Sequence, residues 1–346
     1  MKYMQQDVRP EANATTPREF QKALAQYREP DHTRSTLELV ITGASFVVLW
    51  VIAWWALSIS YWLSLAISVP AGAFLMRLFL IQHDCGHNAF FRRKSVNDWV
   101  GRILGVLTLT PYDYWRRSHA IHHATSGNLD RRGIGDIDIL TVREYRALPR
   151  SRRVLYRLYR HPLVLFLLGP AYQFLLRNRL PLGIADSDRG YWISTMGTNV
   201  SIAVAASIMI YAVGLAPFLM IQLPITLIAS SIGVWLFYVQ HQFEHTLWDE
   251  DDHWQLPDAA LYGSSHYDLP GVLRWITANI GVHHVHHLSS RIPFYRLPQV
   301  LRDFPELTEV KRLTLIESFA CMKLRLWDEG QRRLVSFSEA RALSVE

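Results

Sequence analysis

Residues 39–76 read LVITGASFVVLWVIAWWALSISYWLSLAISVPAGAFLM, a stretch without a single charged side chain. A second charge-free window covers residues 190–240. One helix crosses the hydrocarbon of a bilayer with about 20 apolar residues, so each window is long enough for two crossings. Break signals lie near the middle of both windows, at Ser58–Ser60 in the first and at Gly214–Pro217 and Pro224 in the second. The sequence therefore predicts four membrane helices, near residues 37–57, 61–81, 195–216 and 221–240.

The two windows have an alternative interpretation as buried helical hairpins of a soluble protein. A soluble core helix normally keeps one polar face, whereas these windows carry no charge at all. Two further apolar stretches, residues 99–109 and 163–176, are too short to span comfortably and are expected to be interfacial or re-entrant. We therefore expect an all-α integral membrane fold with four transmembrane helices.

The distribution of positive charge predicts the orientation in the membrane. Half of all Lys and Arg residues occur from Arg92 to Arg189, between the two windows, and the short turns inside the windows hold none. Cytoplasmic loops collect positive charge, so both termini and the central loop are expected on the cytosolic side of the inner membrane. Arg77, near the cytosolic end of the second helix, is expected to extend its head to the interface. These loops also account for the net charge of +6 without a nucleic-acid partner.

The chain divides into three parts by composition. Residues 1–34 are polar and charged, so we expect a cytosolic segment there and no cleavable signal peptide. Within it, Thr16-Pro17-Arg18-Glu19 predicts the start of a short amphipathic helix. Residues 35–305 make up the membrane domain, and residues 306–346 are expected to form a cytosolic tail. The only cysteines, Cys85 and Cys321, give no disulfide framework and fit a reducing compartment.

Histidine is concentrated in four short groups. Eleven of the 15 His residues fall in HDCGH at 83–87, HAIHH at 119–123, HQFEH at 241–245 and HHVHH at 283–287. Residues three and four apart share a helix face, so each group can aim two or three imidazoles at one point. One such pair is weak evidence, but four groups with matched spacing indicate a shared site.

The position of these groups supports the same conclusion. The first and third groups follow the second and fourth predicted membrane helices, and the others lie in the central loop and the C-terminal part. With four crossings, all four groups end on one side of the membrane. A histidine-rich metal transporter is the alternative from another class, but transporters place their ligands near the bilayer midplane, and neither window contains a histidine.

The number of histidines bears on the number of metals. Neutral imidazole suits Zn, Cu, Fe and Ni, and one zinc site needs only three or four ligands. The four groups place two, three, two and three imidazoles at helical spacing, which makes ten, and ten imidazoles suit two metals with four or five ligands each. Soluble di-iron bundles use two Glu-x-x-His motifs. In this chain Glu29 to His32 and Glu250 to His253 have that spacing, and both lie outside the four histidine groups. The zinc-protease pattern His-Glu-x-x-His is absent.

These motifs resemble the three histidine boxes of membrane fatty acid desaturases. The stretch from Phe237 to His245 resembles that family's further metal-binding segment, and Trp275 to Gly281 resembles the corresponding part of bacterial acyl-lipid enzymes of the delta-12 and delta-5 type. The resemblance covers roughly residues 35 to 300. It implies a cytosolic helical cap that carries a histidine-coordinated di-metal site.

The resemblance also implies the ligands and the chemistry. The metal ligands would be His83, His87, His119, His122, His123, His241, His245, His283, His286 and His287. In some relatives an Asn stands where this chain has His241, so direct ligation is expected more firmly of His245 than of His241. His284 is extra to the pattern and is expected to have a structural or supporting role. The isolated histidines, including His266, are not assigned to the metal.

The implied activity is an oxygen-dependent desaturation of a fatty acyl chain. It would use two iron ions, O2 as co-substrate, a lipid or fatty acyl substrate, surrounding membrane lipids and an external electron donor of the ferredoxin type. Hydroxylases and ketolases that act on alkanes, lipids or carotenoids carry similar boxes and remain the alternative. Acceptors that orient the imidazoles are expected among five carboxylates, Asp84, Asp136, Asp138, Glu244 and Asp268, although loop capping is an equally good interpretation of Asp136 and Asp138.

Overall fold

Four long helices dominate the computed structural model, which describes residues 16–183 and 189–342. They are α2 (His32–Ala56), α3 (Tyr61–Gly86), α9 (Arg189–Val213) and α10 (Leu215–His241). Within the described residues, these four are long and apolar enough to cross a membrane. The predicted all-α membrane fold with four spanning helices is thereby confirmed, with each helix extending a few residues beyond one or both predicted ends.

Local sequence explains where the long helices begin and turn. Asp31 caps α2 by accepting a hydrogen bond from the backbone N–H of Arg34, and Ser60 caps α3 in the same way from Trp62. Gly214 joins α9 to α10 with a φ of +90°, which a residue with a side chain rarely adopts. Each pair of helices is therefore an antiparallel hairpin with a turn of four residues or fewer.

Helix α3 is the centre of the bundle, and it packs against both α2 and α10. Gly72 permits the close approach of α3 to α10, because a Cβ there would lie 2.7 Å from Cγ2 of Ile228. The outer faces are apolar and exposed: Trp55 on α2 and Tyr211 on α9 are examples, with Tyr211 95% exposed. Such a surface fits a hydrocarbon environment.

Arg77 corrects one expectation from the sequence. Its side chain does not extend to an interface but is 1% exposed, inside the bundle. It forms an ion pair with Glu38 of α2 at 2.5 Å and a hydrogen bond with Thr42 at 3.1 Å. Its guanidinium also donates to the backbone oxygen of Trp275 and lies over that ring. The expectation was wrong because sequence position alone did not reveal a buried carboxylate partner on the neighbouring helix.

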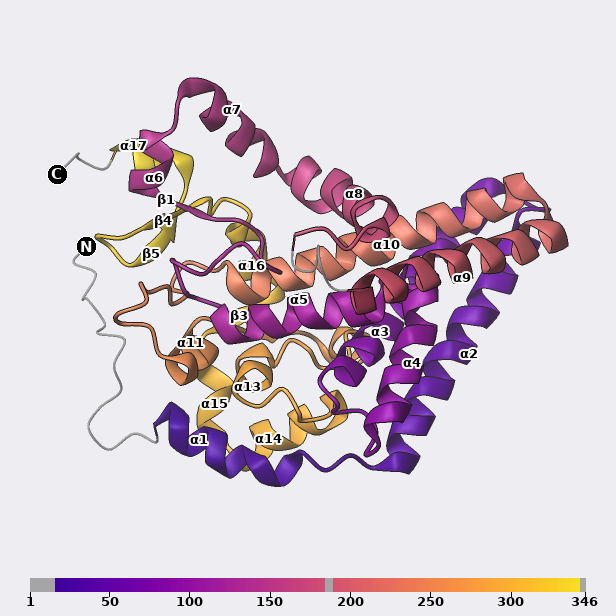
Figure 1. The fold of residues 1–346 in the computed structure, drawn as a ribbon, viewed down its shortest axis with the longest axis horizontal. Coiled ribbons are helices and arrows are strands. Elements are labelled where there is room, and N and C mark those ends of the chain that lie inside the picture. The colour runs from indigo at the N-terminus through magenta and orange to yellow at the C-terminus, as the bar shows by residue number, and fades with distance from the viewer. Residues whose placement is uncertain (1–15, 184–188, 343–346) are drawn as a thin grey trace.

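The remaining elements gather around one end of the long helices, and we call residues 16–31, 87–183 and 242–342 the cap (Figure 1). Its helices are α1 (Pro17–Ala23), α4 (Lys94–Leu107), α5 (Tyr112–Thr125), α6 (Val142–Ala147), α7 (Arg150–Tyr159), α8 (Gly169–Leu175), α11 (Leu256–Tyr262), α12 (Gly271–Ile276), α13 (His283–Leu288), α14 (Leu297–Asp303), α15 (Glu306–Glu309), α16 (Leu315–Cys321) and α17 (Phe337–Ala342). Shorter helical turns are η1 (Leu24–Tyr27), η2 (Val164–Leu168), η3 (Arg177–Arg179) and η4 (Phe294–Arg296). Helix α1 begins with the predicted capping box, in which Thr16 and Glu19 bond each other's backbone N–H.

Five short strands add two small sheets to the cap. Strand β1 (Leu140–Thr141) runs parallel to β4 (Leu326–Asp328), with Leu140 opposite Leu326, and β5 (Arg333–Val335) pairs antiparallel with β4. Strand β2 (His266–Asp268) runs parallel to β3 (Arg312–Thr314), with His266 opposite Arg312. Residues near the C-terminus are thereby fixed to the central loop and to the segment before α13, close to the histidine groups.

Candidate metal centre

Four helices bring the histidine groups to one place. His83 lies in the last turn of α3, and His87 is the residue that caps its C-terminus. Helix α5 carries three histidines in its C-terminal half, and α13 carries the late group. His241 is the last residue of α10. Because α3 and α10 end on the same side of the bundle, their histidines face those of the cap, as the sequence predicts.

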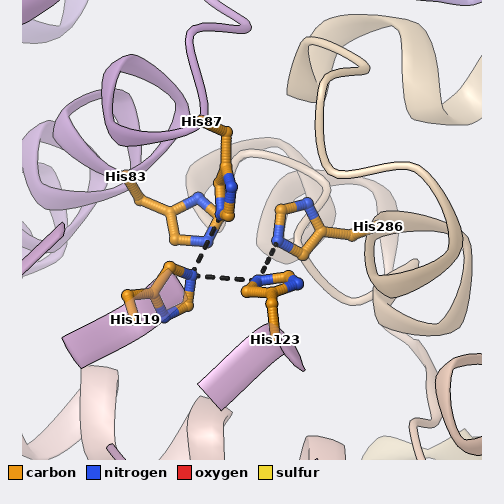
Figure 2. Close-up of side chains that lie close together, drawn as sticks. All are labelled: His83, His87, His119, His123 and His286. Atoms are coloured by element: carbon orange, nitrogen blue, oxygen red, sulfur yellow. Dashed lines mark hydrogen bonds between the residues drawn. The ribbon is translucent and has the colours of Figure 1, made fainter. Parts of the chain in front are cut away.

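Five imidazoles form a first group (Figure 2): His83, His87, His119, His123 and His286. The Nε2 atoms of His119 and His87 are 3.0 Å apart, and those of His123 and His119 are 3.1 Å apart. The Nε2 atom of His286 completes the set 3.2 Å from that of His123. The rings come from α3, α5 and α13 and point toward a common centre.

Four imidazoles form a second group: His122, His241, His283 and His287. Nε2 of His241 lies 3.2 Å from Nε2 of His122 and 3.0 Å from that of His283. Nε2 of His287 is 3.1 Å from that of His283. All four side chains are buried.

The two groups adjoin because α5 and α13 each supply both. On α5, His119 and His123 belong to the first group while His122 belongs to the second. On α13 the division is reversed, since His286 joins the first group and His283 and His287 join the second. The rings of His123 and His287 stack at 4.1 Å across the boundary.

The geometry of each group suits a metal ion. Nitrogen ligands lie about 2.1 Å from a first-row metal such as zinc, so two that bind at right angles are about 3.0 Å apart. The observed separations of 3.0–3.2 Å match this value. Burial lowers the pKa of His119, His123, His283 and His287 well below the usual value, and neighbouring imidazoles lower it further. Neutral rings keep the lone pairs that a metal requires.

Two of the five expected carboxylates orient imidazoles. Asp136 accepts a hydrogen bond of 2.6 Å from Nδ1 of His122. Asp84 lies 3.3 Å from Nδ1 of His83 and accepts a second hydrogen bond, of 2.7 Å, from the backbone of Phe294. A partner on Nδ1 directs Nε2 toward the metal.

The other three carboxylates were predicted wrongly. Asp268 pairs with Arg274 and Arg312, and Glu244 pairs with Arg333. Asp138 is exposed, and only its backbone is engaged in the hydrogen bonds seen for it, with Tyr159 and Arg160. The sequence placed these residues near histidines along the chain, but their side chains turn toward arginines or solvent.

His245 is the one expected ligand that the structure does not bring to either group. It is exposed, whereas His241, which was expected less firmly, is buried within the second group. The spacing argument required α10 to continue through His245, but the helix ends at His241 and Gln242 leaves it with φ −119° and ψ 69°. The two residues therefore do not share a helix face.

The extra histidines have structural partners. His284 donates from Nε2 to the backbone oxygen of Leu307 at 2.9 Å, away from both groups, as expected of a supporting residue. His266 donates from Nδ1 to the oxygen of Thr308 at 2.6 Å. Both bonds attach the chain around α13 to the C-terminal part of the cap.

Sequence reasoning missed two residues beside the site. Trp115 stacks on His119 with ring centroids 4.8 Å apart, and its position four residues before a histidine was a signal that could have found it. Arg160 is fully buried and donates to the side chain of Gln242 and to the backbone oxygen of Asp138. Nothing in the local sequence distinguishes Arg160 from the other arginines of the central loop.

Four membrane-length helices and nine imidazoles in two adjoining groups define an integral membrane protein with a histidine-rich site that could hold metal ions. A family model described as fatty acid desaturase matches residues 60–318. A fatty acid desaturase of Bacillus subtilis is 44% identical over 95% of this chain and 93% of its own length. An sn-1 oleoyl-lipid 12-desaturase of Anabaena variabilis is 25% identical over 79% and 75%. An sn-1 acyl-lipid omega-3 desaturase (ferredoxin) of a Nostoc species is 26% identical over the same shares. The chain belongs to the fatty acid desaturase family.

Proposed function

We propose that this enzyme inserts a cis double bond into a lipid acyl chain, using O2, two iron ions and an external electron donor. The main observation that supports this proposal is that a chain of this family has two adjoining imidazole groups, one with five rings and one with four. In this proposal the nine grouped histidines are the ligands, and His245 is not one of them. Residues 35–305 form the membrane domain, with residues 1–34 and 306–346 on the cytosolic side.

The chemistry explains why a metal pair is needed. Two hydrogens must leave neighbouring methylenes, whose C–H bonds are too weakly acidic for any side-chain base. When bound, iron supplies with O2 the oxidising power for this step. The protein's own contribution is position: α5 and α13 hold the two groups next to each other, and Asp84 and Asp136 fix the rings of His83 and His122.

Burial and charge define the remaining roles of the chain. Six of the nine grouped imidazoles are buried and the other three, His87, His119 and His123, are half-buried, so the cap limits the access of bulk water to the site. The orientation proposed here, with both termini and the cap in the cytosol, is supported by the positive charge between the two apolar windows. A ferredoxin-like donor is supported by relatives from cyanobacteria whose names include ferredoxin.

Expression in a host that lacks polyunsaturated acids tests the function, with mass spectrometry of its lipids. The expected result is a new cis double bond, lost in His286→Ala and His122→Ala variants that still insert into the membrane. A new hydroxyl or keto group without an olefin would favour the hydroxylase or ketolase alternative. Metal analysis of the purified protein should find two irons per chain, and adding reduced ferredoxin to isolated membranes should restore turnover.

A further inference from the structure

A small cavity lies against the second histidine group. Its volume is about 10 Å³, and it is lined by Ser126, Asp136, Ile137, Phe237, His241, Gln242 and Trp248. A buried cavity of this order holds one water when two to four polar groups surround it. The cavity is therefore the right size for a single water molecule, provided that its walls supply hydrogen-bond partners.

Two of its lining residues carry buried polar atoms that have no partner among the described residues. One is Oδ2 of Asp136, whose other oxygen binds His122, and the other is Nε1 of Trp248. The body of Trp248 packs against apolar neighbours, Ile139 and Trp327 among them, so its N–H is held in place without a partner. A buried polar group without a hydrogen-bond partner is destabilising, so nearly all such groups in folded proteins have one. Two such atoms beside one cavity indicate a common partner.

The other polar side chains of the cavity differ in what they can offer. Gln242 uses both ends of its amide, accepting from Arg160 and donating to the oxygen of Ile137 at 3.0 Å. Ser126 has its hydroxyl 3.5 Å from Nδ1 of His241, at the limit of a hydrogen bond. Ser126 is therefore the third group available to a water in this cavity, and a buried water typically makes about three bonds.

We propose that one ordered water occupies this cavity, accepts a hydrogen bond from Nε1 of Trp248 and donates to Oδ2 of Asp136, so that Trp248 is a positioning residue for the second histidine group. The water fixes the carboxylate that orients His122. It also links the segment that follows α10, and with it His241, to the loop that carries Asp136. Trp248 touches neither substrate nor metal and acts only through Asp136.

The proposal rests on the proposed function for its metal-release test, which compares Trp248→Phe with Trp50→Phe. Trp50 is also buried and donates from its indole, to Gln222 at 3.1 Å, but it lies in α2 away from the histidines. Protein purified with its iron is mixed with a chelator, and the iron retained is followed by elemental analysis. Loss of a supporting partner typically weakens metal binding about 10–100-fold. In Trp248→Phe, the iron of the second histidine group should be released faster than in Trp50→Phe by this factor. The iron of the first group should be released at the same rate in both variants.

The positioning role would be overturned if Trp248→Phe released its iron at the same rate as Trp50→Phe. It would also be overturned if Trp248→Phe accelerated the release of both irons to the same extent. If Trp248→Phe does not yield folded protein, Ser126→Ala replaces it, with the same selective release expected and unchanged release contradicting the role. A high-resolution structure of the parent supplies the independent arm: density for a water bonded to Asp136 and Trp248 is expected, and an empty cavity overturns the proposal. If the parent protein contains no iron, the proposed function fails instead. The presence of the water is then tested by the electron density of the high-resolution structure alone.

Discussion

Asp136 accepts a hydrogen bond from His122 at 2.6 Å, although Asp136 lies in a loop 14 residues beyond the histidine. The carboxylate side chain is 9% exposed and the imidazole 1%. A buried carboxylate in this position selects the ring tautomer and raises the basicity of the nitrogen that faces the metal. The loop is thus part of the candidate metal centre, although it supplies no ligand.

The first prediction concerns this carboxylate. Asp136→Asn keeps the shape but removes the charge, so we expect activity and iron affinity to fall about 10–100-fold. Lipid analysis and iron content of the purified protein measure the effect. Asp251→Asn is the control, because Asp251 pairs with Arg131 at the surface and such pairs contribute about 0–1 kcal/mol. Equal activity of the two variants would remove Asp136 from the site.

The second prediction separates His241 from His245. His241→Ala should abolish product and lower the iron content, because it removes one of four imidazoles in the second group. His245→Ala should keep parental activity and two irons, since its side chain is exposed and outside both groups. The opposite pattern would mean that α10 continues past Gln242 in the loaded enzyme and that His245 is a ligand.

The third prediction concerns the buried ion pair of α2 and α3. Glu38→Leu leaves Arg77 buried without its carboxylate, which typically costs about 3–5 kcal/mol. The double variant Glu38→Leu/Arg77→Leu should recover most of this stability, because both charges are then absent. Thermal unfolding of the purified protein in detergent measures both. A double variant no more stable than Glu38→Leu alone would show that the pair is not energetically coupled.

The fourth prediction tests the contact between α3 and α10. Gly72→Ala should destabilise the protein by about 1–3 kcal/mol, because the added Cβ meets Ile228 at 2.7 Å and the backbone oxygen of Ile225 at 3.1 Å. Gly43→Ala is the matched control on α2, where nothing lies within 4 Å of the added carbon. It should be neutral or stabilising, since alanine favours helix. Similar unfolding temperatures for both variants would contradict a tight α3–α10 contact.

Much of the fold follows from patterns along the chain. The charge-free windows predicted four helices because hydrocarbon excludes charge over a fixed length, and the break signals at Ser58–Ser60 and Gly214 coincide with the two turns. The second turn was nevertheless expected after residue 216, whereas α9 ends at Val213, and Pro224, also taken as a break signal, lies inside α10. Arg77 lay outside such reasoning: its burial depends on Glu38 of another helix, and only helix packing decides which side chains meet. The short strands were also missed, because two- and three-residue strands have too little sequence pattern to detect.

The sequence by itself determined that the histidines of three groups, those at 83–87, 119–123 and 283–287, would share helix faces, because spacing of three or four residues places side chains on one face. For the group at 241–245 this expectation was wrong, since α10 ends at His241. Only the tertiary structure decided how the rings divide. On α5, His122 belongs to the group of His241, whereas His119 and His123 belong to the other group. On α13, His286 belongs to the group of His83, whereas His283 and His287 do not. The physical reason is that rings meet across helices, so the grouping depends on helix packing and on where each helix ends. The end of α10 is held by Gln242 and the distant Arg160.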